Sequence, residues 1–166
     1  MQTVVGIDPG LADTGYAVLG LDGDGPHGLR LVEAGLVRTN PGLPLERRLL
    51  ELYQGVLEVL RQHRPLAMAA EDLYAHYEHP RTAILMGHAR GVVLLAAAAT
   101  GTPVHHFAPA RIKKSLTGNG AAGKRQIQRT VQRLLGLSCL PEPDHVADAL
   151  SAAVCYHFAR VGVPAS

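Results

Sequence analysis

Short apolar segments separated by turn residues occupy the first forty positions of the chain. Thr3–Asp8, Tyr16–Leu21 and Arg30–Val37 each have the length and composition of a strand. A Pro-Gly pair follows the first segment, and the glycine-rich stretch Asp22–Gly28 separates the second from the third. We therefore expect three antiparallel strands at the start of the fold.

After position 44, apolar residues recur every three or four positions, which predicts helices. The expected helices are Leu45–Gln62, with Pro44 in its first turn, Thr82–Ala99, Lys124–Leu135 and about His145–Ala159, the last capped by Asp144. Pro65–Glu71 and Thr102–Phe107 predict two further strands. Strands first, then alternating helices and strands, predict an α/β domain with a mixed sheet.

Length and composition restrict the class of protein. A chain of 166 residues favours a single domain spanning residues 1–166, and 47% hydrophobic with 18% charged residues excludes disorder as its main state. No uninterrupted apolar run approaches the roughly 18 residues of a membrane span, and no signal peptide is visible. Two cysteines make no disulfide framework. We therefore expect a cytoplasmic protein with no membrane partner.

The charge is unevenly distributed, although the net value is only +2. Between Glu78 and Glu142 there is no acidic residue, and this acid-free window holds nine of the sixteen basic residues. These nine are Arg81, Arg90, Arg111, Lys113, Lys114, Lys124, Arg125, Arg129 and Arg133. A solvated basic helix face is one interpretation, but the pattern favours binding to a polyanion such as DNA.

Four residues combine the chemistry of a metal site. Asp8 and Glu71 end apolar strands, while His145 and Asp148 are three residues apart and share one helix face. Each has an ordinary alternative: a turn cap for Asp8, a surface position for Glu71 with Asp72 turned inward, an ion pair for Asp148, and a surface imidazole for His145. Buried carboxylates that converge repel one another unless a cation separates them. Together the four are typical of two-metal phosphodiester hydrolysis with Mg²⁺ or Mn²⁺, two ions per site.

Several motifs resemble those of the RuvC crossover junction endodeoxyribonucleases, over about residues 3–160. They are Gly6-Ile7-Asp8-Pro9-Gly10 with Thr14-Gly15-Tyr16, the helix segment Gly87–Val92, the basic loop Pro109–Lys124, and the closing motif Asp144–Leu150. The resemblance implies an RNase H-like fold with a mixed five-stranded sheet flanked by helices. It also implies a homodimer that resolves four-way (Holliday) junctions by paired symmetric nicks, in homologous recombination and DNA repair.

The resemblance assigns roles to particular residues. The four active-site positions of the family fall on Asp8, Glu71, His145 and Asp148, and this chain is similar to those members that carry His rather than Asp at the third. Lysines that contact DNA fall on Lys113 and Lys124, and an aromatic residue at the junction centre falls on Tyr74. We expect Lys114 and Arg125 beside them to hold phosphates as well. The resemblance also suggests a branch-migration complex of the RuvA and RuvB type as partner.

Some alternatives remain open from the sequence. The helix Thr82–Ala99, rich in Gly and Ala, fits either a dimer interface or a core helix. The first motif also resembles the phosphate loop of actin-like sugar kinases, but those need a second domain and usually have Thr where this chain has Leu11. A non-enzymatic junction-binding protein and an enzyme acting on RNA:DNA hybrids are further candidates. A zinc site is not indicated, because the spacing of His105, His106, Cys139 and Cys155 matches no common zinc motif.

Overall fold

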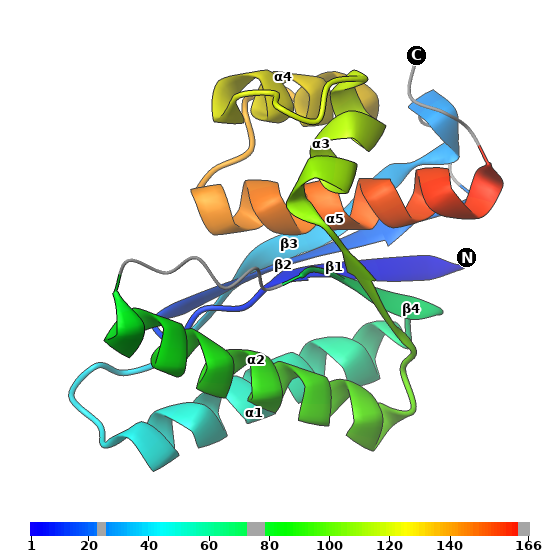
Figure 1. Ribbon diagram of the computed structural model, residues 1–166. Coiled ribbons are helices and arrows are strands. Elements are labelled where there is room, and N and C mark those ends of the chain that lie inside the picture. Colours follow the sequence, from blue (N-terminus) through cyan, green and yellow to red (C-terminus); the bar gives the residue numbers. More distant parts are fainter. Residues whose placement is uncertain (23–25, 73–78, 163–166) are drawn as a thin grey trace.

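A five-stranded mixed sheet forms the centre of the protein. A computed structural model describes residues 1–22, 26–72 and 79–162. The strands are β1 (Thr3–Asp8), β2 (Asp13–Gly20), β3 (Arg30–Arg38), β4 (Ala67–Glu71) and β5 (Val104–Phe107), with a 3-10 turn at Pro26–Gly28. Their order in the sheet is β3-β2-β1-β4-β5 (Figure 1). β2 pairs antiparallel with both β1 and β3, whereas β4 pairs parallel with both β1 and β5. The predicted antiparallel start and mixed sheet are confirmed.

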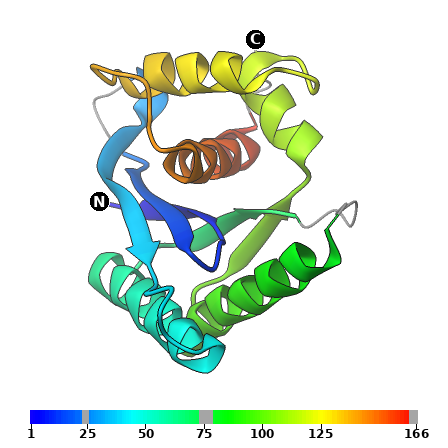
Figure 2. The ribbon, with the colours of Figure 1, turned by 90° about the vertical axis from the view of Figure 1, so that its left-hand side faces the viewer.

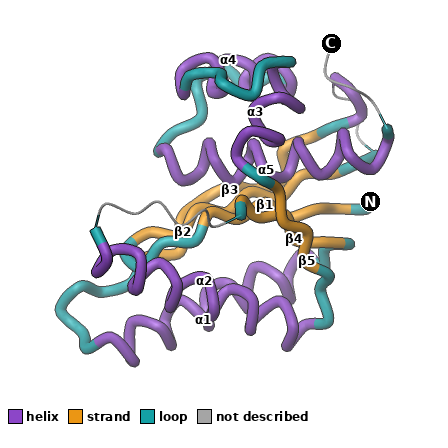
Figure 3. The backbone as a smooth tube through the Cα atoms, in the orientation of Figure 1, coloured by secondary structure: helices purple, strands orange, loops and turns teal. Residues whose placement is uncertain are grey.

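Helices cover both faces of the sheet. They are α1 (Leu45–His63), α2 (Pro80–Thr100), α3 (Pro109–Thr117), α4 (Lys124–Leu135) and α5 (Asp144–Val161). One face carries α1 and α2, and the other carries α5 with α3 and α4 outside it. Figure 2 shows these layers with α5 viewed along its axis. Since α5 lies between the sheet and another helical layer, apolar residues surround it on nearly all sides. The tube in Figure 3 shows the same sandwich of helix, strand and helix.

The helix α2 buries only one of its faces. Ala89, Val93 and Ala96 pack against the sheet and α1, whereas Ile84 and Leu95 are 61% and 59% exposed. Averaged over the helix, α2 is long and apolar enough to cross a membrane, a criterion that helices of soluble proteins also meet. The sequence expectation considered only uninterrupted apolar runs and therefore did not detect this property.

Three local expectations are wrong. The segment expected as a basic loop begins with α3, which has Pro109 in its first turn and ends at Gly118 with a φ of 75°. Asp144 is the first residue inside α5 rather than its cap, because Pro143 occupies the cap position. Similarly, Pro44 precedes α1 as its cap residue instead of lying in the first turn. The remaining predicted helices and strands are confirmed to within about three residues at their ends.

Candidate active site

The amino-terminal half of α5 lies directly against β1 and β2 because two glycines face it. A Cβ on Gly15 would overlap the backbone of His145, and a Cβ on Gly6 would overlap the carbonyl group of Ala149. Gly15 is the partner of Asp8 in the β1–β2 ladder. The close approach therefore brings the first turn of α5 to the carboxyl end of β1, where Asp8 lies.

His145 and Asp8 are in direct contact although 137 positions separate them in the chain. The Nδ1 atom of His145 lies 2.6 Å from Oδ2 of Asp8. The side chain of Asp8 is 24% exposed and that of His145 is 46% exposed. Asp8 is therefore half-buried and paired with an imidazole, and His145 is more than a surface residue of the first helical turn.

Glu71 and Asp148 border a common pocket beside this pair. Since β4 runs parallel to β1, with Ala70 opposite Ile7, Glu71 ends its strand next to Asp8. The pocket, of about 260 Å³, lies between β4, α3, α4 and α5. Its charged lining residues are Glu71, Lys113, Lys124 and Asp148. The structure thus brings together the four residues that the sequence singled out.

Burial raises the pKa values of all three carboxyl groups, and repulsion from neighbouring carboxylates adds to this rise for Glu71 and Asp148. The pKa of Glu71 rises to about 6, first because of desolvation and then because of the negative charges of Asp148 and Asp8. Desolvation and the charge of Asp8 likewise raise the pKa of Asp148. Desolvation raises the pKa of Asp8, and the hydrogen bond from His145 opposes it. The basic groups nearby do not fully offset the negative charge of these carboxylates, and a divalent cation would offset it.

The donor set fits a hard divalent cation in its chemistry. Three carboxylates offer the oxygen ligands that Mg²⁺ and Mn²⁺ prefer, and one imidazole is compatible with Mn²⁺. Within residues 1–22, 26–72 and 79–162, no three His, Cys, Asp or Glu side chains already stand in the arrangement of a bound metal.

The basic residues near the site differ in their surroundings. Nζ of Lys124 lies 2.6 Å from Oδ2 of Asp144, so Asp144 serves as an ion-pair partner. Lys113 borders the pocket and is half-buried, while Lys114 and Arg125 are exposed. Tyr74 lies outside the described residues.

One residue of the acid-free window, Arg90, faces the protein interior instead of solvent. The side chain of Arg90 is 11% exposed and contacts Glu71, Asp72 and His106. The sequence contains a signal for this burial, because Arg90 is the only Asp, Glu, Lys or Arg residue between Thr82 and Ala99. An isolated charge in an apolar helix indicates a buried polar contact. Asp72 is turned toward Arg90, so Glu71 is the member of that pair in the pocket.

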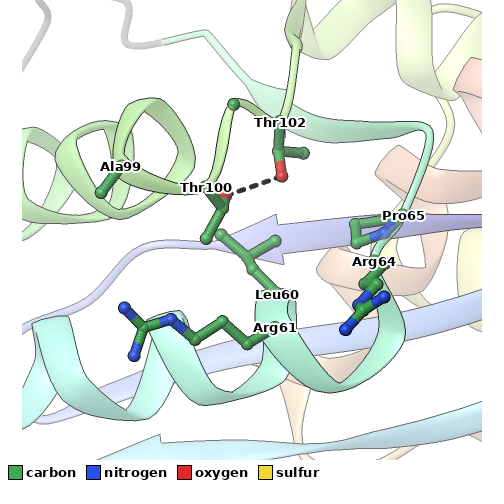
Figure 4. A pocket seen from close by; sticks show the side chains of 8 residues that line it. Leu60, Arg61, Arg64, Pro65, Ala99, Thr100 and Thr102 are labelled. Atoms are coloured by element: carbon green, nitrogen blue, oxygen red, sulfur yellow. Dashed lines mark hydrogen bonds between the residues drawn. The ribbon is translucent and has the colours of Figure 1, made fainter.

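Neither a second hollow nor the two cysteines have the features of a catalytic centre. A hollow of about 480 Å³ lies where α1 and α2 end, and its described lining includes Arg61, Arg64 and the mutually bonded hydroxyls of Thr100 and Thr102 (Figure 4). The arginines lie at the carboxyl end of α1, where positive charge offsets the helix dipole, and the described lining has no carboxylate. Both cysteines are free, Cys155 buried and Cys139 exposed.

The fold and the acidic ends of β1 and β4 beneath α5 define a nuclease of the RNase H-like class. Residues 4–156 match the family model described as "Crossover junction endodeoxyribonuclease RuvC". The chain belongs to this family, and it is an endodeoxyribonuclease of a divalent-metal-dependent type. The resemblance stated from the motifs is confirmed, and the sugar-kinase alternative is set aside.

Individual relatives support the same assignment. A crossover junction endodeoxyribonuclease RuvC of Rhodopirellula baltica is 50% identical over 155 residues, covering 93% of this chain and 85% of the relative. One from Rubrobacter xylanophilus is 42% identical and covers 96% and 87%. The solved RuvC structure of Thermus thermophilus has a TM-score of 0.87 at 37% identity, covering 99% of each chain. A structure of that RuvC in complex with Holliday junction substrate has a TM-score of 0.88 at 36% identity, with the same coverage.

Proposed function

We propose that this endonuclease resolves four-way (Holliday) DNA junctions by paired symmetric nicks, using Asp8, Glu71, His145 and Asp148 as its catalytic residues. The observation that carries the proposal is their convergence at one end of the sheet, where His145 contacts Asp8, and where desolvation together with the charges of Asp148 and Asp8 raises the pKa of Glu71 to about 6. The junction complex of the similar Thermus thermophilus RuvC supports the choice of substrate. We also propose a role in homologous recombination and DNA repair, and a cytoplasmic location.

The four residues are proposed to hold two divalent ions, Mg²⁺ or Mn²⁺. When bound, such ions lower the pKa of a water molecule and neutralise charge on the scissile phosphate. Asp8 ends the central strand β1 and would contact both ions, whereas Glu71 and Asp148 would hold one each. Desolvation raises the pKa of Asp8, and the hydrogen bond from His145 limits that rise and so favours the charged form. The expected products carry a 5′ phosphate and a 3′ hydroxyl.

The basic helices next to the pocket are the proposed DNA surface. Lys113 and Lys124 border the pocket itself, and exposed Lys114 and Arg125 extend positive charge along α3 and α4. Such residues position the phosphate backbone without reading its sequence. Tyr74 is proposed to stack on an unpaired base near the crossover, a contact worth about 1–3 kcal/mol per base.

Paired nicking requires two active sites, and the exposed face of α2 is the proposed dimer interface. Ile84, Gly87, Gly91 and Leu95 follow the i, i+3, i+7, i+11 spacing of one helix face. Both glycines have open space where a Cβ would lie, which allows a second helix to approach closely. A two-fold axis would match the symmetry of the junction. A branch-migration complex of the RuvA and RuvB type is a further proposed partner.

The test is cleavage of a mobile four-way junction and of a linear duplex with the same sequence, with Mg²⁺, Mn²⁺ or a chelator. We expect ligatable, symmetric nicks in the junction alone, only with metal. Asp8→Asn is expected to abolish cleavage while junction binding persists. Tight binding by the unaltered protein without nicking under any metal would instead indicate an architectural DNA-binding protein.

A further inference from the structure

A buried arginine lies on the opposite face of the sheet from the pocket. Arg90 is in the middle of α2, and its side chain is only 11% exposed. Removing a guanidinium from water is costly unless hydrogen bonds and opposite charge compensate. The partners of Arg90 therefore indicate what its position achieves.

Those partners all belong to the ends of β4 and β5. Nη1 of Arg90 donates to the backbone carbonyl oxygen of Glu71 at 2.6 Å, and Nη2 lies 2.6 Å from Nδ1 of His106. Because a guanidinium only donates, Nδ1 of His106 is the acceptor and its proton is on Nε2. That tautomer cannot donate from Nδ1 to Asp72, so the 3.7 Å approach of these two groups is not a hydrogen bond. Nη2 also lies 3.6 Å from Oδ1 of Asp72.

The alternation of side chains along the strands separates Arg90 from the pocket. Ala70 packs in the core cluster on the α1 and α2 side, whereas Phe107 packs in the cluster with α5. Glu71, next after Ala70, therefore directs its carboxylate toward α5 and leaves its carbonyl oxygen to Arg90. From the other direction, the amide of Asp72 donates to the carbonyl oxygen of Phe107 at 2.8 Å. The end of β4 is thus fixed by α2 and by β5.

We propose that Arg90 is a positioning residue for Glu71: its fork of hydrogen bonds fixes the end of β4 and so keeps the Glu71 carboxylate opposite Asp8 and Asp148. This inference rests on the proposed role of Glu71 as a metal ligand. It also removes Arg90 from the set of basic residues that contact DNA. His106 acts as the second anchor, because it accepts the other branch of the fork.

Arg90→Met keeps an unbranched side chain of the same length as the arginine stem up to Nε, and it removes every donor. We expect Mn²⁺ binding to the protein alone, followed by electron paramagnetic resonance of free Mn²⁺, to weaken about tenfold or more, as is usual when a group supporting a metal ligand is lost. The Mn²⁺ concentration for half-maximal cleavage should rise in parallel. Junction affinity and its salt dependence should stay within twofold. Arg47→Met, at an exposed position of α1, is the matched control and should change none of these.

Two further variants keep the test decisive if Arg90→Met does not fold. Arg90→Lys retains one charge without the planar fork, so we expect an intermediate loss of Mn²⁺ affinity. His106→Phe removes one acceptor and should cause a smaller loss in the same direction. In the unaltered protein, ¹⁵N resonances of His106 should report a neutral ring protonated on Nε2.

The outcomes separate this inference from the function on which it rests. If Glu71→Gln abolishes cleavage while Arg90→Met, Arg90→Lys and His106→Phe bind Mn²⁺ like the unaltered protein, the positioning role is overturned and the site stands. A shallower salt slope with weaker junction binding in Arg90→Met would make Arg90 a DNA contact and overturn the role as well. If Glu71→Gln itself cleaves and binds Mn²⁺ normally, the assignment of Glu71 fails, and the inference fails with it.

Discussion

In the absence of metal, the charged carboxyl group of Glu71 lowers the free energy of unfolding. Its pKa of about 6, raised from 4.5 by desolvation and by the charges of Asp148 and Asp8, means that the folded protein holds a proton more tightly than the unfolded chain. The resulting destabilisation is fully present above pH 6 and disappears as the pH falls to about 4.5. At 1.36 kcal/mol per pKa unit this shift corresponds to about 2 kcal/mol, and we expect about half of that because Glu71 is partly exposed.

Glu71→Gln should therefore stabilise the metal-free protein while it abolishes cleavage. We expect Tm, measured with a chelator, to rise by about 2–4 °C above pH 6 and the gain to vanish near pH 4.5. Glu58→Gln, on the exposed face of α1, is the matched control. Equal gains in both variants, or a gain independent of pH, would contradict this origin of the pKa shift.

The ion pair between Lys124 and Asp144 reduces the positive charge available to DNA. Its atoms are 2.6 Å apart and both side chains are more than half exposed, so the pair itself contributes little stability. Asp144→Asn should strengthen junction binding severalfold at low salt and steepen the slope of log K against log salt by about 0.9, equivalent to one more phosphate contact.

Asp22→Asn is the control for this effect, because it makes the same charge change on a residue that contacts Gln2 instead of a lysine. Binding isotherms at several salt concentrations provide the measurement. The same slope for both variants would mean that net charge, and not release of Lys124, accounts for the change.

Sequence patterns indicated the three carboxylates and the imidazole as candidate metal ligands, because each lies at a strand end or on an apolar helix face. The partners of Lys124 and Arg90 could not be predicted in this way. Both contacts join residues brought together only by tertiary folding: α4 with α5 for Lys124, and α2 with β4 and β5 for Arg90. Charge pattern alone treats both as basic residues available to DNA.

At the scale of elements, the contact between α5 and the β1–β2 pair determines the geometry of the site. Gly15 carries this contact, because a Cβ there would overlap the backbone of His145. We expect Gly15→Ala to displace the first turn of α5, to lower the free energy of unfolding by about 1–3 kcal/mol, and to reduce kcat more than junction affinity.

Chemical denaturation and single-turnover cleavage test this expectation. Gly42→Ala, in the turn before α1, is the control, since its Cβ would meet a single side-chain oxygen at 3.3 Å. Unchanged cleavage in a destabilised Gly15→Ala protein would show that α5 positions His145 without help from this close approach.

Element prediction succeeded where the apolar period was clear and missed the short helix α3. The amphipathic spacing of Leu45–His63 and Lys124–Leu135 located both helices. In contrast, the family resemblance gave Pro109–Lys124 as a basic loop, although Pro109 begins α3 and Gly118 caps its end. Its nine residues form a helix because Ile112 and Leu116 pack against α5, a tertiary contact that no local pattern reveals.

At the scale of the molecule, the distribution of exposed apolar residues separates the two helical layers. The layer of α3, α4 and α5 encloses its apolar residues around α5, whereas α2 leaves Ile84 and Leu95 more than half exposed. The core interpretation of this helix is thus confirmed for the face that packs on the sheet, and the interface interpretation stays a prediction for the exposed face.

Ile84→Glu combined with Leu95→Glu should therefore yield a monomer of 17.6 kDa with an intact active site. Charged residues in place of apolar ones prevent close approach of two α2 helices, because burying them would leave like charges unpaired. We expect analytical ultracentrifugation to give the monomer, and cleavage of a supercoiled cruciform plasmid to give single nicks in place of linear product. Val32→Glu, an exposed apolar position on the edge strand β3, is the matched control and should remain dimeric. Paired nicking by a monomeric double variant would contradict the link between the two-fold axis and symmetric cleavage, whereas a persisting dimer would move the interface away from this face of α2.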